Sequence, residues 1–153
     1  MAIYFYKEFG KLGYLASYSS HGFIKDGVYW KTVEHYYQAQ KFHDKTVKQL
    51  IIEAETPKQA STIGRNRRYK LREDWEQVKN EIMHEAVLEK FLQHPDLAEK
   101  LIETGDEEII EDTKKENYWG CGPNGDGLNV YGKILCRVRE ELKIQEQEGG
   151  CIK

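Results

Sequence analysis

The segment Thr32–Phe42 carries many side chains that could do chemistry in a short stretch. It reads TVEHYYQAQKF and holds a carboxylate, an imidazole, two amides, an amine and three aromatic rings. Its first residue is a suitable N-cap, and the absence of Gly and Pro predicts a helix. On that helix Glu34, Gln38 and Lys41 fall at i, i+4 and i+7 along one stripe, and His35 starts the adjacent stripe. We interpret this helix as a candidate site.

Glu34 is the residue in this segment that is best suited to catalysis. The aromatic residues near it in the sequence are Trp30, Tyr36 and Tyr37. A carboxylate in an aromatic surround can have a raised pKa, which tunes a group for general acid or base work. Beside an amine, from Lys41 or Lys7, it suits chemistry at a sugar anomeric carbon, either by stabilising an oxocarbenium-like transition state or with the amine forming an imine. The alternative is a dipole-stabilised helix start with a surface lysine.

A second cluster is the basic segment 65–72, Arg65-Asn66-Arg67-Arg68-Tyr69-Lys70-Leu71-Arg72, with five Arg or Lys in eight residues. Several guanidinium groups at one bend can bind phosphate, because the Arg fork matches its oxygens. The formal net charge of -3 gives no broad basic face, so a phosphorylated small molecule fits better than a long nucleic-acid track. The alternative is that these cations complement the dipole of the preceding helix.

A third cluster is the glycine-rich segment Asn117–Asn129, which predicts a loop leading into a helix. Its backbone N–H groups could hold an anion or a polar sugar. The spacing matches neither the Rossmann fingerprint nor the phosphate loop of nucleotide triphosphatases. Cys121 is a possible nucleophile, but the sequence places no base beside it. The histidines have no metal-ligand spacing, so we expect no metal.

The elements that must position these residues are mainly helical. Asp26-Gly27 predicts a tight turn between strands at 23–25 and 28–30, leading into the Thr32 helix. A short strand is expected at 3–7. Further helices are expected at 45–54, 57–64, 74–93 (the longest), 96–104 and from about 129 onward, and 107–112 is either a strand or a last helical turn.

Length and composition indicate one soluble domain at 1–145, followed by a flexible tail at 146–153. No apolar run is long enough to span a membrane, and the polar N-terminus is unlike a signal peptide. The cysteines Cys121, Cys136 and Cys151 lack C-x-x-C spacing, which indicates neither a disulfide framework nor a zinc site. We therefore expect a cytoplasmic protein with reduced thiols and no membrane partner.

The stretch EHYYQAQKF at 34–42 resembles the central E-H-Y-x-Q-A-x-K-F motif of the NADAR superfamily, the YbiA-like proteins. The resemblance extends over about residues 3–142. Further matching blocks are Gly13-Tyr14-Leu15, Asp26-Gly27, Thr56-Pro57, Gly64-Arg65, Asp74-Trp75, Trp119-Gly120 and Gly132-Lys133. It implies a compact, single-domain, mainly helical YbiA-like fold with a small N-terminal β element. It also implies hydrolysis of N-glycosidic bonds without a metal or other cofactor.

The resemblance also implies roles for individual residues. One branch of the family resembles riboflavin-pathway N-glycosidases, which split 5-amino-6-(5-phosphoribosylamino)uracil into the base and ribose 5-phosphate. Other members remove ADP-ribose from guanine bases in nucleic acid, through a lysine imine with the opened ribose. Glu34 becomes the expected catalytic carboxylate, with Lys7 and Lys41 both candidates for the amine. The expected substrate-binding residues are His35, Gln38, Arg65, Arg67, Trp75, Trp119, Gly120 and Asn129.

Two departures from the family pattern fall where substrate is expected. Where members commonly read L-S-N-F, this chain has Leu15-Ala16-Ser17-Tyr18, so only Ser17 can replace the Asn. Cys121 follows Trp-Gly, where riboflavin-type members often carry an acid. The sequence predicts an N-glycosidase acting on phosphoribosylated heterocycles. The alternatives are an ADP-ribosyl-guanine hydrolase, for which nucleic acid is a partner only as the ADP-ribosylated substrate, and a non-catalytic module that binds ADP-ribose or a related nucleotide.

Overall fold

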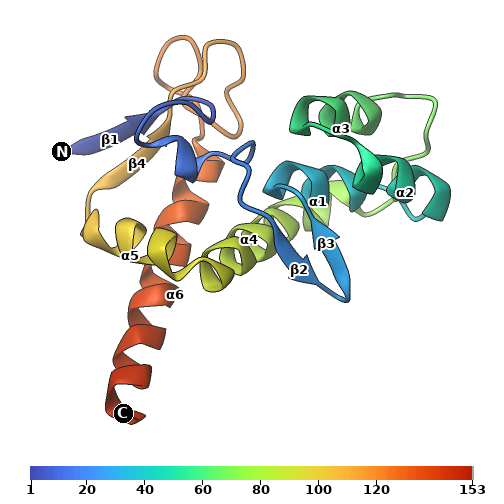
Figure 1. Cartoon of the computed structure of the whole chain (residues 1–153). Helices are drawn as coiled ribbons and strands as arrows, with labels where there is room; N and C mark the ends of the chain where they lie inside the picture. Colours follow the sequence, from blue (N-terminus) through green and yellow to red (C-terminus); the bar gives the residue numbers. More distant parts are fainter. Residues whose placement is uncertain (153) are drawn as a thin grey trace. The chain divides into compact units, whose positions relative to one another are not determined.

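The computed structural model describes residues 1–152, with side chains described through residue 148. Helices dominate it, with a few short strands, so the predicted mainly helical fold class is confirmed (Figure 1). The chain divides into two compact units. One unit consists of Ser17–Lys90, and the other of Met1–Ala16 together with Phe91–Lys153.

The unit Ser17–Lys90 begins with a two-stranded hairpin. Strand β2 (Phe23–Lys25) pairs antiparallel with β3 (Val28–Trp30). The two turn residues, Asp26 and Gly27, have φ of 54° and 77°, the left-handed values that a tight two-residue hairpin turn requires. Both the strand bounds and the turn match the prediction. The hairpin leads directly into the helix that carries Glu34.

Helix α1 (Val33–Ala39) starts as predicted, with Thr32 as its N-cap. The Thr32 hydroxyl accepts a hydrogen bond from His35 N at 3.1 Å, which satisfies one of the free donors of the first turn. All residues of α1 are buried. The helix is shorter than the predicted 32–42, because Lys41 N and Phe42 N bond to the carbonyl groups three residues earlier and tighten the chain into a turn. Lys41 therefore lies just beyond the helix.

Two further helices pack against α1. Helix α2 (Lys45–Glu53) is capped by Asp44, and α3 (Pro57–Gly64) by Thr56, as the Thr-Pro pair predicts. The basic segment 65–72 follows and leads into α4 (Trp75–Gln93), whose residues from Phe91 onward belong to the other unit. The α4 face with Ile82, Met83, Ala86 and Val87 is buried, as its period predicts.

The other unit contains two paired strands that lie far apart in sequence. Strand β1 (Ala2–Phe5) runs parallel to β4 (Glu108–Glu111), so the ambiguous segment 107–112 is a strand. The short 3-10 helix η1 (Gly13–Leu15), α5 (Pro95–Glu103) and α6 (Val130–Ile152) complete the unit. Helix α6 packs on β4 and α5, and the buried Tyr131 donates its hydroxyl to the Leu15 carbonyl oxygen at 2.6 Å.

Helix α6 corrects one prediction about length. It is longer than α4, which the sequence predicted to be the longest helix. It continues as helix to Ile152 through most of the segment predicted to be a flexible tail, because the residues before 148 are mainly good helix formers. Residue 153 lies outside the described residues, and the tail's flexibility stays a prediction. No helix in the described part of the chain has the length and apolar character needed to cross a membrane.

Candidate active site

Glu34 is a buried carboxylate in the first turn of α1. It is 7% exposed, and each of its oxygens accepts one hydrogen bond. Ser17 Oγ donates to Oε1 at 3.1 Å, and Gln38 Nε2 donates to Oε2 at 2.6 Å. Burial raises the pKa of Glu34, while these two donors and the positive charges of Lys41 and Arg65 act in the opposite direction. The result is a desolvated carboxylate held in a fixed orientation.

Lys41 is the amine that the structure places in electrostatic contact with Glu34. Its Nζ lies 3.5 Å from the Gly64 carbonyl oxygen and 5.6 Å from the centroid of the Tyr37 ring. The Tyr37 ring in turn meets the buried Trp75 edge to face at 5.1 Å. Burial lowers the pKa of Lys41, and the Glu34 carboxylate opposes that shift. A carboxylate and an amine of altered acidity therefore lie together.

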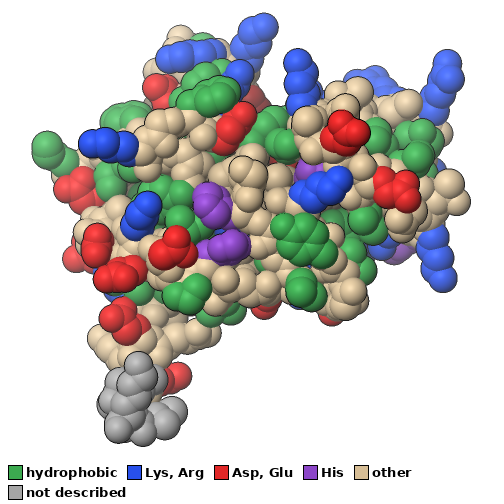
Figure 2. Space-filling view, in the orientation of Figure 1, with side chains coloured by type: hydrophobic (Ala, Val, Ile, Leu, Met, Phe, Trp, Pro, Cys, Tyr) green, Lys and Arg blue, Asp and Glu red, His purple; other side chains and the backbone are tan. Residues whose placement is uncertain are grey.

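Both ends of the basic segment 65–72 are attached at Lys41. Before the segment, the Gly64 carbonyl oxygen faces Lys41 Nζ, and at its far end Arg72 N donates to the Lys41 carbonyl oxygen at 2.8 Å. The segment thus leaves the site and returns to it. Figure 2 shows Lys and Arg side chains standing out from the surface over the part of the molecule that holds α2 and α3, among a few acidic ones.

The basic segment encloses a hollow of about 440 Å³ that we call the cationic hollow. Three cations and no acidic residue line it. The lining residues are Phe42, Gly64, Arg65, Asn66, Arg67, Tyr69, Lys70 and Leu71. Because Arg65 also interacts electrostatically with Glu34, the hollow suits an anionic group of a ligand whose reacting atoms lie at the carboxylate.

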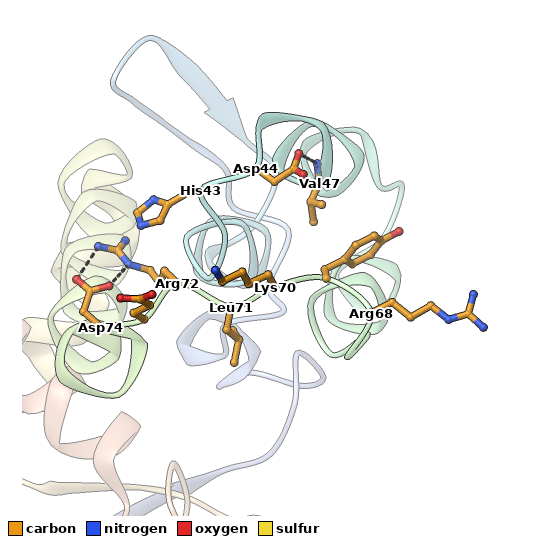
Figure 3. A pocket seen from close by; sticks show the side chains of 10 residues that line it. His43, Asp44, Val47, Arg68, Lys70, Leu71, Arg72 and Asp74 are labelled. Atoms are coloured by element: carbon orange, nitrogen blue, oxygen red, sulfur yellow. Dashed lines mark hydrogen bonds and ion pairs between the residues drawn. The ribbon is translucent and has the colours of Figure 1, made fainter.

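A larger hollow, of about 800 Å³, is lined by the same segment together with the residues at the start of α2 (Figure 3). Its charges are mixed: Arg72 is paired with Asp74 at 2.6 Å, and the Asp44 carboxylate caps α2. Figure 3 shows Arg68 projecting away from the Arg72–Asp74 pair. None of the predicted catalytic or substrate-binding residues lines this hollow, whereas Arg65 and Arg67 line the cationic hollow, so the greater volume does not mark the site.

His35 is not the substrate-binding residue that the sequence predicted. It is fully buried, with Nδ1 2.8 Å from Thr32 Oγ1 and Nε2 3.0 Å from the Ala54 carbonyl oxygen. Both ring nitrogens are therefore occupied by protein atoms. Burial lowers the pKa of His35, which favours the neutral ring. Its role is to join α1 to the end of α2.

A carboxylate of the chain itself occupies the anion-binding position of the glycine-rich loop 117–129. The Glu116 carboxylate accepts hydrogen bonds from the backbone N–H groups of Tyr118, Trp119 and Gly120. The first N–H groups of α6 are also occupied, since those of residues 130 and 131 donate to loop carbonyl oxygens. The prediction that this loop and helix start present open N–H groups to an anion is therefore wrong.

Two predicted wall residues of the loop also serve the fold. The Asn129 side chain accepts from Glu111 N at 3.0 Å and donates to the Ile109 carbonyl oxygen at 2.9 Å, which fastens the loop to β4. A Cβ atom on Gly120 would lie 2.4 Å from Thr113 Cγ2, so the glycine is required by close packing. Both residues therefore have a part in the fold, and their substrate-binding roles stay predictions.

We expect Glu116→Gln to destabilise the unit that contains the loop. The substitution weakens three charge-assisted hydrogen bonds, so the free energy of unfolding should fall by about 1.5–3 kcal/mol. Urea denaturation measures it. Glu108→Gln, on the exposed side of β4, is the control and should change stability by less than about 0.5 kcal/mol. Equal stability of the two variants would contradict the assignment.

Lys7 and Trp119 are two further predicted site residues outside the unit that contains Glu34. Lys7 is exposed on the turn after β1, with a φ of 54°, and Nζ 5.2 Å from the Tyr6 ring. Trp119 is half-buried, and the roles of both residues stay predictions. Ser17, which the sequence placed where substrate is expected, donates to Glu34, and Gly64, which the sequence did not predict as a site residue, packs against Gln38. Among the described residues, no group of three or more His, Cys, Asp or Glu is gathered as a metal site.

Comparison with known proteins places the chain in a family. A family model described as the NADAR domain matches residues 4–143. An N-glycosidase of Nostoc punctiforme is 49% identical over 146 residues, covering 94% of each chain. The N-glycosidase YbiA of Escherichia coli is 37% identical over 144 residues, covering 94% of this chain and 90% of that protein.

A longer relative and a solved structure agree with this. A riboflavin biosynthesis protein of Vibrio vulnificus is 41% identical over 141 residues, which are 92% of this chain and 38% of that protein. The NMR structure of Escherichia coli YbiA matches with a TM-score of 0.90 and 37% identity, over 96% of this chain and 88% of that one. The match of the family model over most of the chain is decisive: the chain belongs to the NADAR domain family.

Proposed function

We propose that this chain, an N-glycosidase by its family and its relatives, cleaves the bond between ribose phosphate and a heterocyclic base, with 5-amino-6-(5-phosphoribosylamino)uracil as the substrate type. The observation that carries the proposal is the buried Glu34 carboxylate beside Lys41, next to a hollow lined by cations. The name of the Vibrio vulnificus relative, a riboflavin biosynthesis protein, supports the choice of base.

In this reaction Glu34 acts at the anomeric carbon. As the bond from C1 of the ribose to the base nitrogen breaks, positive charge develops on C1 and the ring oxygen, and a nearby carboxylate stabilises it. A water molecule adds its oxygen to C1. Glu34 takes a proton from that water and releases it to solvent, while the departing base nitrogen takes a proton from solvent, so the products are the free base and ribose 5-phosphate. The low exposure of Glu34 strengthens both interactions, because little water competes with them.

The cationic hollow supports a phosphate on the substrate. Arg65, Arg67 and Lys70 line it, and no acidic residue is part of its lining. Arginine binds phosphate oxygens with two parallel N–H donors, and a lysine adds a point charge. Arg65 also interacts with Glu34, so a phosphate held there would belong to the molecule whose anomeric carbon meets the carboxylate. A phosphoribosyl group fits this arrangement.

Arg65→Gln is therefore expected to weaken the binding of the phosphorylated substrate selectively. Losing a charge-assisted contact of about 1.5–3 kcal/mol corresponds to a rise in KM of roughly 10- to 150-fold. The dephosphorylated ribosylaminouracil should be affected much less, and only through the interaction of Arg65 with Glu34. The matched control is Arg68→Gln, because Arg68 does not line the cationic hollow and should leave KM unchanged. An equal loss on both substrates would argue against phosphate binding by Arg65.

The proposal as a whole is tested by product analysis. Purified protein is incubated with 5-amino-6-(5-phosphoribosylamino)uracil, and ribose 5-phosphate is measured enzymatically. The expected result is stoichiometric release of ribose 5-phosphate and the aminouracil. Release that is no faster than without protein would overturn the proposed substrate.

A second candidate function is removal of ADP-ribose from guanine bases in nucleic acid. Lys41 favours it, because burial lowers the pKa of Lys41 and so increases the fraction of neutral amine that can attack an opened ribose. This function requires an essential lysine, whereas the phosphoribosyl reaction above needs only its charge. Trapping of an imine on Lys41 by borohydride, together with the activity of Lys41→Arg, separates the two.

A further inference from the structure

The Glu34 carboxylate is held by two neutral donors from different parts of the chain. Ser17 Oγ donates a hydrogen bond to Oε1 at 3.1 Å, and Gln38 Nε2 donates one to Oε2 at 2.6 Å. Ser17 is itself fixed, because its carbonyl oxygen accepts a hydrogen bond from Glu34 N at 3.1 Å. Hydrogen bonds to a carboxylate favour its ionised form. The two donors therefore oppose the protonation that burial favours.

The contact with Glu34 also fixes the orientation of the Gln38 amide. A flipped amide would turn its carbonyl oxygen toward the carboxylate, which is repulsive while Glu34 is ionised. In the observed orientation the other end, Gln38 Oε1, is buried without a hydrogen-bond partner. An unpaired buried acceptor is costly, so stability alone does not explain an amide at this position. The donor to Glu34 is what the amide contributes.

Gly64, the last residue of α3, packs directly against this amide. A Cβ atom at position 64 would lie 2.0 Å from Gln38 Oε1 and 2.9 Å from Gln38 Cβ. Gln38 is 3% exposed, so its side chain cannot turn out into solvent without displacing the residues that cover it. The need for glycine here is steric. Any side chain at this position must displace the amide that serves Glu34.

We propose that Ser17 and Gln38 are positioning residues that keep the Glu34 carboxylate ionised and correctly oriented for N-glycosyl cleavage, and that Gly64 keeps Gln38 in place. This rests on the catalytic role proposed for Glu34. Two charged groups interact with Glu34: Lys41, which follows α1, and Arg65, which follows α3, and both also favour the ionised form. Because both oxygens accept hydrogen bonds, Glu34 acts as a base and charge stabiliser and not as a proton donor.

The experiment compares Ser17→Ala, Gln38→Met and Gly64→Ala by two measurements. The first is the acid limb of the pH profile of kcat/KM, and the second is the titration of the Glu34 carboxyl by ¹³C NMR, assigned by difference from Glu34→Gln. Loss of one donor should move both midpoints upward by about one pH unit, since the charged form loses a hydrogen bond. The expected loss is in kcat more than in KM.

Two further variants sharpen the test. The double variant Gly64→Ala/Gln38→Met should behave like Gln38→Met alone, because Gly64 acts through Gln38. Ser17→Asn, whose amide N–H replaces the hydroxyl donor, should restore the midpoint that Ser17→Ala shifts. Gln49→Met, on the exposed surface of α2, is the matched control and should leave the midpoint unchanged.

The outcomes separate this proposal from the proposed function. Midpoints that stay unchanged in Ser17→Ala, Gln38→Met and Gly64→Ala would overturn the positioning role, even if activity falls. The NMR measurement needs no substrate, so it decides this question whether or not the protein cleaves the phosphoribosyl compound. Full activity of Glu34→Gln would contradict the proposed function instead. Ser17 is only partly buried, so Ser17→Ala with its Asn rescue decides the outcome if a core variant fails to fold.

Discussion

Glu34→Gln is expected to lower kcat for ribose 5-phosphate release by about 10²- to 10⁴-fold, the range that loss of a positioned general base produces. The amide cannot take a proton from water, and it carries no charge to stabilise the developing oxocarbenium ion. KM should change little, because the cationic hollow is unaffected. Steady-state kinetics of wild type and variant measure both quantities.

The control for this variant is Glu55→Gln. Glu55 is exposed before α3, so its loss of charge should leave kcat unchanged. A Glu34→Gln protein with wild-type turnover would remove Glu34 from the mechanism. The variant is expected to fold, because the new amide can accept from Gln38, while the Ser17 hydroxyl can turn to accept from it.

Glu34→Gln should also make the protein more stable at neutral pH. Burial raises the pKa of Glu34 in the folded state, so the folded protein binds its proton more tightly than the unfolded chain does. Stability therefore falls as pH rises from the unfolded pKa of Glu34 through the raised folded pKa, and it stays lower above. Glu34→Gln lacks this loss, so its advantage in Tm should be present at pH 7 and vanish in acid. A variant less stable at pH 7 would contradict this.

Lys41→Met is expected to have the next largest effect on activity. It removes the positive charge nearest to Glu34 while keeping an unbranched apolar side chain against the Tyr37 ring. If Lys41 acts only through its charge, the loss should be about 10- to 150-fold in kcat/KM, equivalent to one charge-assisted interaction. Lys41→Arg should then restore part of the activity.

A chemical test separates this from an imine mechanism. Borohydride added during turnover would reduce an imine and attach the sugar covalently to Lys41, which mass spectrometry detects. The phosphoribosyl reaction proposed above predicts no attached sugar and partial activity in Lys41→Arg. An attached sugar together with an inactive Lys41→Arg would favour the second candidate function. Lys58→Met, on the exposed face of α3, controls for loss of a surface lysine.

Local signals in the sequence predicted much of the fold. The hairpin bounds and α3 match because each depends on neighbouring residues: Asp26-Gly27 for the turn, and Thr56-Pro57 for the helix start. The pairing of β1 with β4 could not be predicted in this way. The two strands lie about a hundred residues apart in the sequence, and no local sequence pattern predicts which strand another strand will pair with.

The candidate site was predictable in its carboxylate but not in its supporting contacts. Glu34, Gln38 and Lys41 were singled out by type and spacing, and the structure brings them together in electrostatic or hydrogen-bond contact. His35 and Asn129 have equally suitable chemistry, yet protein atoms occupy their polar groups. Only the three-dimensional surroundings distinguish a side chain that binds the fold from one that is free to bind substrate.

Two misjudged features had partial signals in the sequence. Thr32 was predicted as an N-cap three residues before His35, which is the spacing at which its hydroxyl meets that residue. Glu116 immediately precedes the glycine-rich loop, and an acid at the start of such a loop can fill the N–H groups that an anion would otherwise occupy. Gly64 was noted only as the end of a helix and as part of a block that matches the family, and neither signal shows that it must be glycine, because that requirement comes from a residue on another helix.

The most direct test of the central claim is a parallel substrate comparison. Wild type and Glu34→Gln would each be given 5-amino-6-(5-phosphoribosylamino)uracil and, separately, guanine-ADP-ribosylated DNA, with released ribose 5-phosphate and ADP-ribose quantified. The predicted result is ribose 5-phosphate from the first substrate, dependent on Glu34, and no ADP-ribose from the second. Release of ADP-ribose alone would contradict the phosphoribosyl substrate, and binding without cleavage of either compound would contradict catalysis by Glu34.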